Sequence, residues 1–511
     1  MYVHMVNSYA GGKGPKILLM THIARVVRKP VKSYLHPVMK ILLVIHDLIT
    51  IPLGISYISA VARGEGHEVE VASLSEEDIA RAVRRYEPDV VAFGATSGFH
   101  QTYLDAMASV RGITSAAIVM GGAHATFFPE VVLESPQLDF CFRGESEEAF
   151  LQLLSHLEGG RSVDEVGNLV RRVDGKMVSN PLLPLEQDLD SIPFPDRSFY
   201  DRYDMANRRA VFVITGRGCP YGCTYCFNHA FKKLYSGLGQ VCRRRSVGNV
   251  LEEIRRDREA MPGLSMIVFQ DDIFILDREW TLDFCRRYPR EVGLPFHCHL
   301  RANLVDEEVA RALKRAGCHS IKMAIESASP RLRNGILGRK MSNETIERAF
   351  RAVRDAGIII VSQNILALPT GTFDDDLDTL RMNCRLGPDF AFATLLQPYP
   401  RTEIGAFCRD RGLLQNGTGD SLPDSFFDGT VLDIPDRKRR ERMRKLFALS
   451  IEFPFLRGRI KRLTELPLDG VYDLLDRVWK GYCIKQREFP YSMPLREYVR
   501  SALDYLRTRY Y

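Results

Sequence analysis

The chain has 511 residues, 45% of them hydrophobic and 26% charged, a composition typical of soluble globular proteins. This length exceeds what one hydrophobic core usually holds, so we expect two to four domains. A net charge of +6 is small for this length, and no nucleic-acid partner is expected. No apolar run reaches the roughly 18 residues that a membrane-spanning helix needs. The sequence also lacks the pattern of a secretory signal peptide.

The number and spacing of the cysteines indicate in which cellular compartment the protein is found. The eleven cysteines are odd in number and mostly scattered, which fits a secreted disulfide framework poorly. A reducing cytoplasm fits better and would also preserve an iron–sulfur cluster. We therefore predict a cytoplasmic protein whose scattered cysteines are buried thiols.

The N-terminal stretch, residues 1–38, is a basic extension without acidic residues. Its cations are Lys13, Lys16, Arg25, Arg28, Lys29 and Lys32. One interpretation is a basic tail. The other, which we favour, is that the natural protein begins at Met39, because a buried strand is expected directly after it.

Residues 39–185 alternate short apolar strands with amphipathic helices, and residues 186–205 form a proline-containing linker. Expected strands are 41–46, 68–71, 90–94 and 116–120, and expected helices are 52–64 and 76–86. Such alternation predicts an α/β domain with a doubly wound, Rossmann-like parallel sheet. A hairpin is expected over 168–178, with Asp174-Gly175 at its turn.

Residues 206–405 repeat the alternation. Strands are expected at 211–215, 266–270, 295–300, 320–325, 358–366 and 390–396, with helices between them such as 306–316 and 343–356. Six strand–helix units predict a partial (β/α)6 barrel like that of triosephosphate isomerase, with its chemistry at the carboxyl ends of the strands. Residues 406–511 are expected to be mostly helical and to cover the open side of the barrel.

Three cysteines follow the first barrel strand. Cys219, Cys223 and Cys226 have the spacing C-x3-C-x2-C, and thiolates are the usual ligands of iron–sulfur clusters. Three ligands hold three irons of a 4Fe–4S cubane and leave the fourth iron open, as a catalytic centre requires. Gly218 and Gly222 would let the backbone wrap around the cluster. The alternative is a zinc site, for which His229 is the nearest histidine, although its spacing is unusual.

This loop resembles the signature of the radical S-adenosylmethionine (SAM) superfamily. The resemblance implies that SAM binds the open iron and is cleaved to methionine and a 5′-deoxyadenosyl radical. It places Tyr225 near the adenine, Asp271 and Asp272 near the amino group, and Glu326 at the ribose. Asn364, like Arg301, Asn303 and Gln363, is a candidate contact to SAM or substrate. The alternatives are a helix cap for the aspartates and rim residues for the others.

The segment 398–403, Pro-Tyr-Pro-Arg-Thr-Glu, resembles the Pro-Tyr-Pro-Gly-Thr-Glu closing segment of these enzymes. Arg401 replaces the glycine, which leaves open whether this loop has the backbone usual in the family.

The N-terminal domain resembles the cobalamin domains fused to radical SAM barrels. Small residues at strand ends allow a large flat ligand to approach the backbone. The candidate cobalamin contacts are Leu53, Gly54, Gly94, Thr96, Ser97, Gly121, Gly122 and His124. A further match is the segment 143–147, Arg-Gly-Glu-Ser-Glu. None of the twelve histidines has an aspartate two positions before it, so no lower axial histidine is expected, and His124 is a candidate contact to the nucleotide tail or a capped strand-end residue.

The resemblance implies methyl transfer to an unactivated carbon or phosphorus centre of a small-molecule or lipid-like substrate, with cobalamin as methyl carrier. Ring formation or rearrangement is the alternative, and a non-catalytic cobalamin-binding module is a weaker one. A methylthiotransferase is disfavoured. Enzymes of that class carry three further cluster cysteines in their N-terminal domain, whereas residues 39–158 contain only Cys141. An electron donor such as flavodoxin or ferredoxin is implied. Peripheral membrane contact through residues 453–456, Phe-Pro-Phe-Leu, is a further expectation.

Overall fold

A computed structural model describes residues 38–46, 52–75, 77–98, 100–198, 203, 209–415 and 429–490. The basic extension predicted over residues 1–38 lies outside these ranges, apart from Val38. So do parts of the predicted linker and of the C-terminal region. Among the described residues, no helix has both the length and the apolar character needed to cross a bilayer.

The first sheet has seven strands in the order β2-β1-β3-β4-β5-β6-β7. Strands β1 to β5 are parallel, whereas β6 and β7 pair antiparallel at one edge. The strands are β1 (Lys40–Ile45), β2 (Glu68–Ser73), β3 (Val90–Gly94), β4 (Ala117–Gly121), β5 (Phe140–Phe142), β6 (Leu169–Val173) and β7 (Lys176–Ser179). The Rossmann-like sheet is confirmed, and the predicted hairpin is β6–β7, with Asp174 and Gly175 both at positive φ in its turn.

Strand β1 is buried on both faces because its apolar residues alternate between two cores. Leu42 and Val44 join the core under helices α2 (Ile79–Tyr86) and α3 (His100–Arg111). Ile41, Leu43 and Ile45 join the core under α1 (Leu53–Gly64) and α6 (Glu147–Glu158). A continuous apolar run such as Ile41–Ile45 is therefore what a parallel strand covered on both sides requires. Short helices α4 (Gly122–Phe127) and α5 (Val131–Glu134) follow β4.

The second sheet has six parallel strands in the order β15-β14-β13-β12-β11-β8. Its strands are β8 (Ala210–Val213), β11 (Met266–Phe269), β12 (Phe296–Leu300), β13 (Cys318–Glu326), β14 (Ile359–Leu366) and β15 (Phe390–Leu395). The six strands predicted from the sequence are thereby confirmed, with small shifts at their ends. Because the spatial order follows the chain order, the sheet is a partial barrel.

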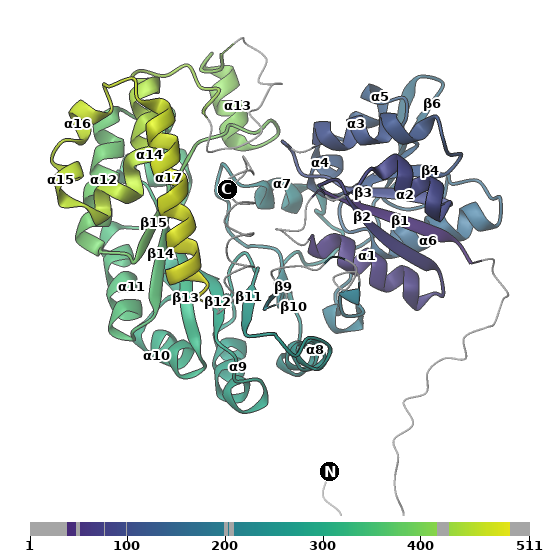
Figure 1. The fold of residues 1–511 in the computed structure, drawn as a ribbon, viewed down its shortest axis with the longest axis horizontal. Helices are drawn as coiled ribbons and strands as arrows, with labels where there is room; N and C mark the ends of the chain where they lie inside the picture. The colour runs from purple at the N-terminus through teal and green to yellow at the C-terminus, as the bar shows by residue number, and fades with distance from the viewer. Residues whose placement is uncertain are drawn as a thin grey trace, which may run out of the picture. The chain divides into compact units, whose positions relative to one another are not determined.

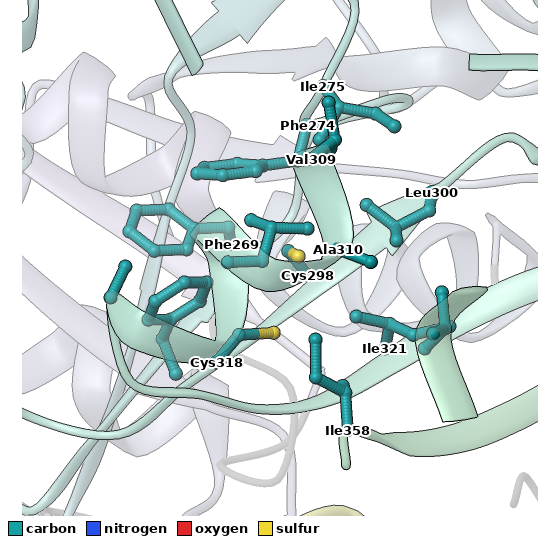
Figure 2. Close-up of a cluster of buried hydrophobic side chains, with 14 of the residues drawn as sticks. Phe269, Phe274, Ile275, Cys298, Leu300, Val309, Ala310, Cys318, Ile321 and Ile358 are labelled. Atoms are coloured by element: carbon teal, nitrogen blue, oxygen red, sulfur yellow. The ribbon is translucent and has the colours of Figure 1, made fainter. Parts of the chain in front are cut away.

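One face of the barrel sheet packs against helices, as Figure 1 shows for α9, α10 and α11. These outer helices are α8 (Val247–Ala260), α9 (Arg278–Glu291), α10 (Glu307–Arg315), α11 (Asn343–Asp355) and α12 (Phe373–Leu386). Figure 2 shows part of this core, where Phe269 and Phe274 gather with Cys298, Cys318 and Ile321. The opposite, inner face is covered in part by the end of the C-terminal region.

The C-terminal region is helical in its described part, as predicted. It comprises α13 (Glu403–Asp410), α14 (Arg437–Glu452), α15 (Pro454–Arg457), α16 (Ile460–Leu463), α17 (Asp469–Cys483) and a π-helical turn, Ile484–Glu488. The end of this region lies against the inner face of the barrel sheet. The Ser320 hydroxyl donates to the Glu488 carbonyl oxygen (2.8 Å), and the Glu488 carboxylate pairs with Lys322 (2.7 Å).

Candidate functional site

The three clustered cysteines lie on one loop that follows β8. The loop runs from strand β9 (Gly216–Arg217), which pairs with β10 (Arg243–Arg244), to helix α7 (Phe227–Leu234). Gly218 has a φ of 88°, and a Cβ atom there would lie 2.3 Å from the Val241 carbonyl oxygen. The path of the loop therefore requires glycine at this position. Gly222, in contrast, has open space where a Cβ would lie.

Hydrogen bonds hold the cysteine loop from outside. The Thr224 hydroxyl donates to the Ile336 carbonyl oxygen (2.6 Å), and the Thr224 amide donates to that of Leu337 (3.2 Å). The Lys232 ammonium donates to the carbonyl oxygens of Pro220 and Tyr221, each at 2.8 Å. The loop conformation is thus fixed by the protein itself.

One of the three thiols, that of Cys223, has a cationic neighbour. Cys223 is buried, and a guanidinium N–H of Arg301 points at its Sγ over 3.7 Å. Arg301 also lies over the Tyr221 ring, 3.7 Å from its centroid, a cation–π contact. Burial raises the pKa of Cys219 to about 11 and also raises that of Cys226. A bound metal reverses this preference because a coordinating thiol loses its proton.

The zinc alternative finds no support in the position of His229. One ring nitrogen, Nδ1, lies 2.9 Å from the Cys226 carbonyl oxygen, and the other, Nε2, lies 3.4 Å from the Glu403 carboxylate. Within the described ranges, no three His, Cys, Asp or Glu side chains converge on a single metal ion. The ligands of a cubane each bind a different iron and need not converge in this way.

Glu326, Tyr225 and Arg339 form a buried hydrogen-bonded group next to this loop. The Tyr225 hydroxyl donates to Glu326 Oε1 (2.7 Å), and Arg339 Nη1 donates to the same oxygen (3.0 Å) and to the tyrosine oxygen (2.8 Å). Both donors reach Oε1, so Oε2 remains to accept from a ligand. Glu326 has a φ of 62° and sits at a shift in the β13–β14 register, which turns its side chain to the strand end.

Arg339 is a site residue that the sequence interpretation missed. The Arg301 guanidinium donates to the Arg339 carbonyl oxygen (2.6 Å), which ties the two arginines together. The Nε atoms of both are buried without a hydrogen-bond partner among the described residues. Buried donors of this kind are costly when they stay unsatisfied, and the two guanidinium groups place positive charge beside Cys223 and Glu326. The only sequence signal is Gly338, whose φ of 66° lets the chain turn before Arg339.

The two aspartates after β11 differ in their surroundings. Asp271 is buried and accepts hydrogen bonds from the Thr215 hydroxyl (2.6 Å) and amide (3.2 Å), so it fixes the end of β8. Asp272 is more exposed and accepts one hydrogen bond from Asn228 (2.9 Å). Both line a cavity of about 190 Å³ together with Gly218 and Cys242. Burial raises the pKa of the Asp271 carboxyl group.

Asn364 is turned away from the inner face of the barrel. Its amide nitrogen donates to the Phe392 carbonyl oxygen (3.0 Å), and its oxygen accepts from Asn383 of α12 (2.8 Å). These bonds hold the outer helix to the sheet, and they correct our expectation of a SAM contact. Side chains alternate between the two faces of a strand, so its neighbour Gln363 is the residue of β14 that faces inward.

The closing segment keeps the glycine-like backbone although Arg401 replaces the glycine. Arg401 has a φ of 67°, which lies in the left-handed region, and its guanidinium pairs with Glu130 (2.6 Å). The left-handed conformation costs a non-glycine residue about 1–2 kcal/mol. The ion pair and a contact with the Phe128 ring (5.4 Å) accompany this strained turn.

Several glycines lie at the strand ends of the first sheet and at the start of α1. Gly54 and Gly121 have no atom within 4 Å of where a Cβ would lie. Gly122 has a φ of 91°, and a Cβ there would lie 2.6 Å from the Ala95 carbonyl oxygen, so this turn requires glycine. At Gly94 a Cβ would lie 3.1 Å from Ile55. Leu53 begins α1 and is half-buried at this edge.

His124 stands at the same edge. Its Nδ1 lies 3.1 Å from the Ser97 hydroxyl, and its ring stacks on that of His100 with centroids 3.9 Å apart. Burial lowers the pKa of His124 to about 3, so the ring is neutral near pH 7. Thr96 is exposed beside this group. Ser97 and His124 therefore form one polar unit between the ends of β3 and β4.

The motif over residues 143–147 bonds to the loop at β9 and β10. Arg217 pairs with Glu145 (2.9 Å) and Glu147 (2.5 Å), and Arg243 also pairs with Glu145. The Glu145 amide donates to the Tyr235 hydroxyl (3.0 Å). The two glutamates are therefore ion-pair partners of arginines that flank the cysteine loop.

A partial barrel with a three-cysteine loop after its first strand, joined to a Rossmann-like sheet with glycine-rich strand ends, defines a class of metal-cofactor enzymes. Comparison with known families agrees: residues 213–382 match the radical SAM superfamily, and residues 39–154 match the B12 binding domain. The chain belongs to the radical SAM enzymes that carry an N-terminal B12-binding domain. Its cofactors are a 4Fe–4S cluster, SAM and cobalamin.

Among curated proteins, the chain is 30% identical to an uncharacterized methyltransferase, PH0819, of Pyrococcus horikoshii, over 71% of this chain and 79% of the relative. It is 28% identical to the cytidylyl-2-hydroxyethylphosphonate methyltransferase of Streptomyces wedmorensis, over 63% and 70% respectively. It is 24% identical to the anaerobic magnesium-protoporphyrin IX monomethyl ester cyclase of Rubrivivax gelatinosus, over 80% and 76%.

Solved structures show the same fold. The radical SAM methyltransferase TsrM from Kitasatospora setae, with cobalamin and a [4Fe-4S] cluster bound, aligns with a TM-score of 0.63 at 20% identity, over 75% of this chain and 78% of that chain. The cobalamin-dependent SAM radical enzyme OxsB, with aqua-cobalamin and SAM bound, aligns with a TM-score of 0.65 at 17% identity, over 92% and 75%.

Proposed function

We propose that this chain is a cobalamin-dependent radical SAM methyltransferase that acts on an unactivated carbon or phosphorus centre of a small molecule or lipid. The observation that carries the proposal is the presence in one chain of the three-cysteine loop and the B12-binding sheet. The similarity to a protein described as a methyltransferase, at 30% identity over most of both chains, favours methyl transfer among the reactions of this class.

In the barrel, Cys219, Cys223 and Cys226 would hold the cluster, and Tyr225 and Glu326 would bind the nucleoside part of SAM. Asp272 is the better placed of the two aspartates to meet the SAM amino group, because Asp271 is committed to Thr215. When bound, the cluster supplies the electron that cleaves SAM, and cobalamin carries the methyl group. The protein positions these groups and keeps water away from them.

In the first domain, the cobalamin contacts we propose are the strand-end residues of β3 and β4 and the start of α1. They are Leu53, Gly54, Gly94, Thr96, Ser97, Gly121, Gly122 and His124. No lower axial histidine is proposed. His124 is placed instead as a neutral contact to the nucleotide tail, held by Ser97 (3.1 Å).

The proposed function also includes proposed domain boundaries. Residues 39–185 would form the cobalamin domain, 186–205 a linker, 206–405 the radical SAM barrel, and 406–511 the helical C-terminal region. A low-potential electron donor such as flavodoxin or ferredoxin, a cytoplasmic location and a peripheral contact with a membrane surface belong to the same proposal.

Ring formation or rearrangement is the second candidate function. It is favoured by the similarity to a cyclase over 80% of this chain, although at the lower identity of 24%. The two candidates differ in what happens to SAM. Methyl transfer converts SAM to S-adenosylhomocysteine as well as 5′-deoxyadenosine, whereas a cyclase needs only the second of these products.

A glycine-to-alanine variant and a matched control test the cobalamin site. Gly121→Ala is expected to weaken hydroxocobalamin binding by roughly tenfold or more, about 1.4 kcal/mol, because the new methyl group enters the space kept for the ligand. Folding should be unaffected, since no protein atom lies within 4 Å of that Cβ. Equilibrium dialysis of the full chain measures the affinity.

The matched control is Gly112→Ala, which also adds a Cβ in open space but lies at the other end of the sheet, after α3. It should bind cobalamin as the unaltered chain does. Equal affinity of the Gly121→Ala variant and the unaltered chain would count against the proposed cobalamin position.

A further inference from the structure

Helix α17 exposes an apolar stripe to solvent. Val471, Leu474, Leu475, Val478 and Tyr482 recur every three or four residues, so they share one side of the helix. Each of these five residues is between 45% and 58% exposed. Such a row is what a helix normally buries against its own protein.

The side of α17 that faces α14 is charged, and its aspartates are half-buried. Asp469 pairs with Arg442 (3.0 Å), Asp473 with Lys445 (2.9 Å) and Asp476 with Arg444, and all three basic partners lie on α14. The acidic residues of α17 are therefore paired with cations of α14, and the apolar stripe contains none of them. Figure 1 shows α17 and α14 running beside one another.

The apolar surface extends beyond α17. Phe455 of α15 is 60% exposed, and Leu466 and Leu468 in the loop before α17 are 45% and 43% exposed. Phe455 connects to Tyr482 through Phe453 and Trp479, with ring centroids 5.2–5.9 Å apart along the row. A contiguous apolar patch of this kind marks an interaction site, whereas single exposed apolar residues do not.

The charges around the patch indicate what covers it. Arg459 and Arg462 are exposed at the start of α16 and within it, Lys461 of α16 pairs with Asp374 (3.2 Å), and the three aspartates of α17 are paired with α14. Two copies of the chain meeting through this patch would bring these cations toward one another. An anionic bilayer attracts them and accepts the apolar side chains, while Tyr482 and Trp479 are residues that favour the membrane–water interface.

We propose that the patch formed by α15, α16 and α17 docks the protein on the surface of an anionic lipid bilayer. The stripe from Val471 to Tyr482 spans eleven helical rises, about 17 Å, and would lie in the plane of the interface. The docking deepens the membrane contact included in the proposed function, and it does not depend on the methyl-transfer chemistry. It would bring the barrel to a surface where lipid-like substrates are held.

Flotation of the full chain with vesicles tests the proposal. Vesicles of mixed phosphatidylcholine and phosphatidylglycerol should carry the protein at low salt, and vesicles of phosphatidylcholine alone should carry less of it. The double variant Leu474→Asp, Val478→Asp should lose at least about tenfold in partitioning to the mixed vesicles, because charged groups do not enter the apolar boundary. Added salt should weaken binding by the unaltered chain.

Leu133→Asp, which places the same charge at an exposed leucine of α5, is the matched control and should bind as the unaltered chain does. Cobalamin binding and iron content of the double variant show that it remains folded. Absence of the unaltered chain from both vesicle fractions, or equal binding by the double variant, would overturn the docking. So would a dimer in sedimentation velocity that the double variant dissociates, because the patch would then be a subunit interface. Loss of SAM cleavage with vesicle binding intact would count against the proposed function alone.

Discussion

Replacing Cys219, Cys223 and Cys226 together with alanine is expected to remove the iron–sulfur cluster and SAM cleavage completely. The unaltered chain, reconstituted without oxygen, should bind about four irons. The variant has no thiolate at any of the three positions, and among the described residues no group of three His, Cys, Asp or Glu side chains could hold a metal ion in their place. Iron content and the visible absorbance of the cluster are the measurements.

Cys384→Ala serves as the control, since Cys384 is half-buried on α12, far along the chain from the loop and with no ligand spacing. It should retain the full iron content. An unchanged iron content in the triple variant would contradict the assignment of these three cysteines as cluster ligands, whatever the control shows.

Glu326→Gln is expected to weaken SAM binding by about 1–3 kcal/mol, or roughly 5- to 150-fold, while the cluster still assembles. The carboxylate can accept from two ribose hydroxyls, and the amide offers one acceptor oxygen. In addition, Arg339 loses its anionic partner at 3.0 Å. Isothermal titration with SAM on the reconstituted protein measures the affinity.

The control must separate SAM binding from the loss of a buried ion pair. Asp376 is a buried carboxylate that pairs with Arg440 (2.6 Å) between α12 and α14. Asp376→Asn should lower the free energy of unfolding, as Glu326→Gln does, but should leave SAM affinity unchanged. If both variants reduce SAM affinity equally, or neither does, Glu326 is only a residue of the barrel rim.

The strands and their order could be predicted because buried parallel strands are short apolar runs between amphipathic helices. Ile41–Ile45 is such a run, and its alternate residues fill two cores. The cysteine loop could be found because its ligands are adjacent in sequence. The role of Gly218 in the loop could also be predicted, since glycine is the residue that most readily adopts a positive φ.

Other site features could not be predicted because they depend on contacts between distant segments. Arg339 reaches Tyr225, which is 114 residues away, and the preceding Gly338 indicates only a turn and not this contact. The choice between Asn364 and Gln363 required knowing which face of β14 points inward. The exposed apolar stripe of α17 could not be predicted for the same reason, because it depends on the ion pairs between its aspartates and α14.

The most direct test of methyl transfer is the set of SAM-derived products made by the full chain with its cluster, cobalamin, a low-potential reductant and candidate substrates. We predict S-adenosylhomocysteine and 5′-deoxyadenosine together, with the first product absent when cobalamin is omitted. Turnover that yields 5′-deoxyadenosine and methionine with no S-adenosylhomocysteine would contradict methyl transfer and favour ring formation or rearrangement.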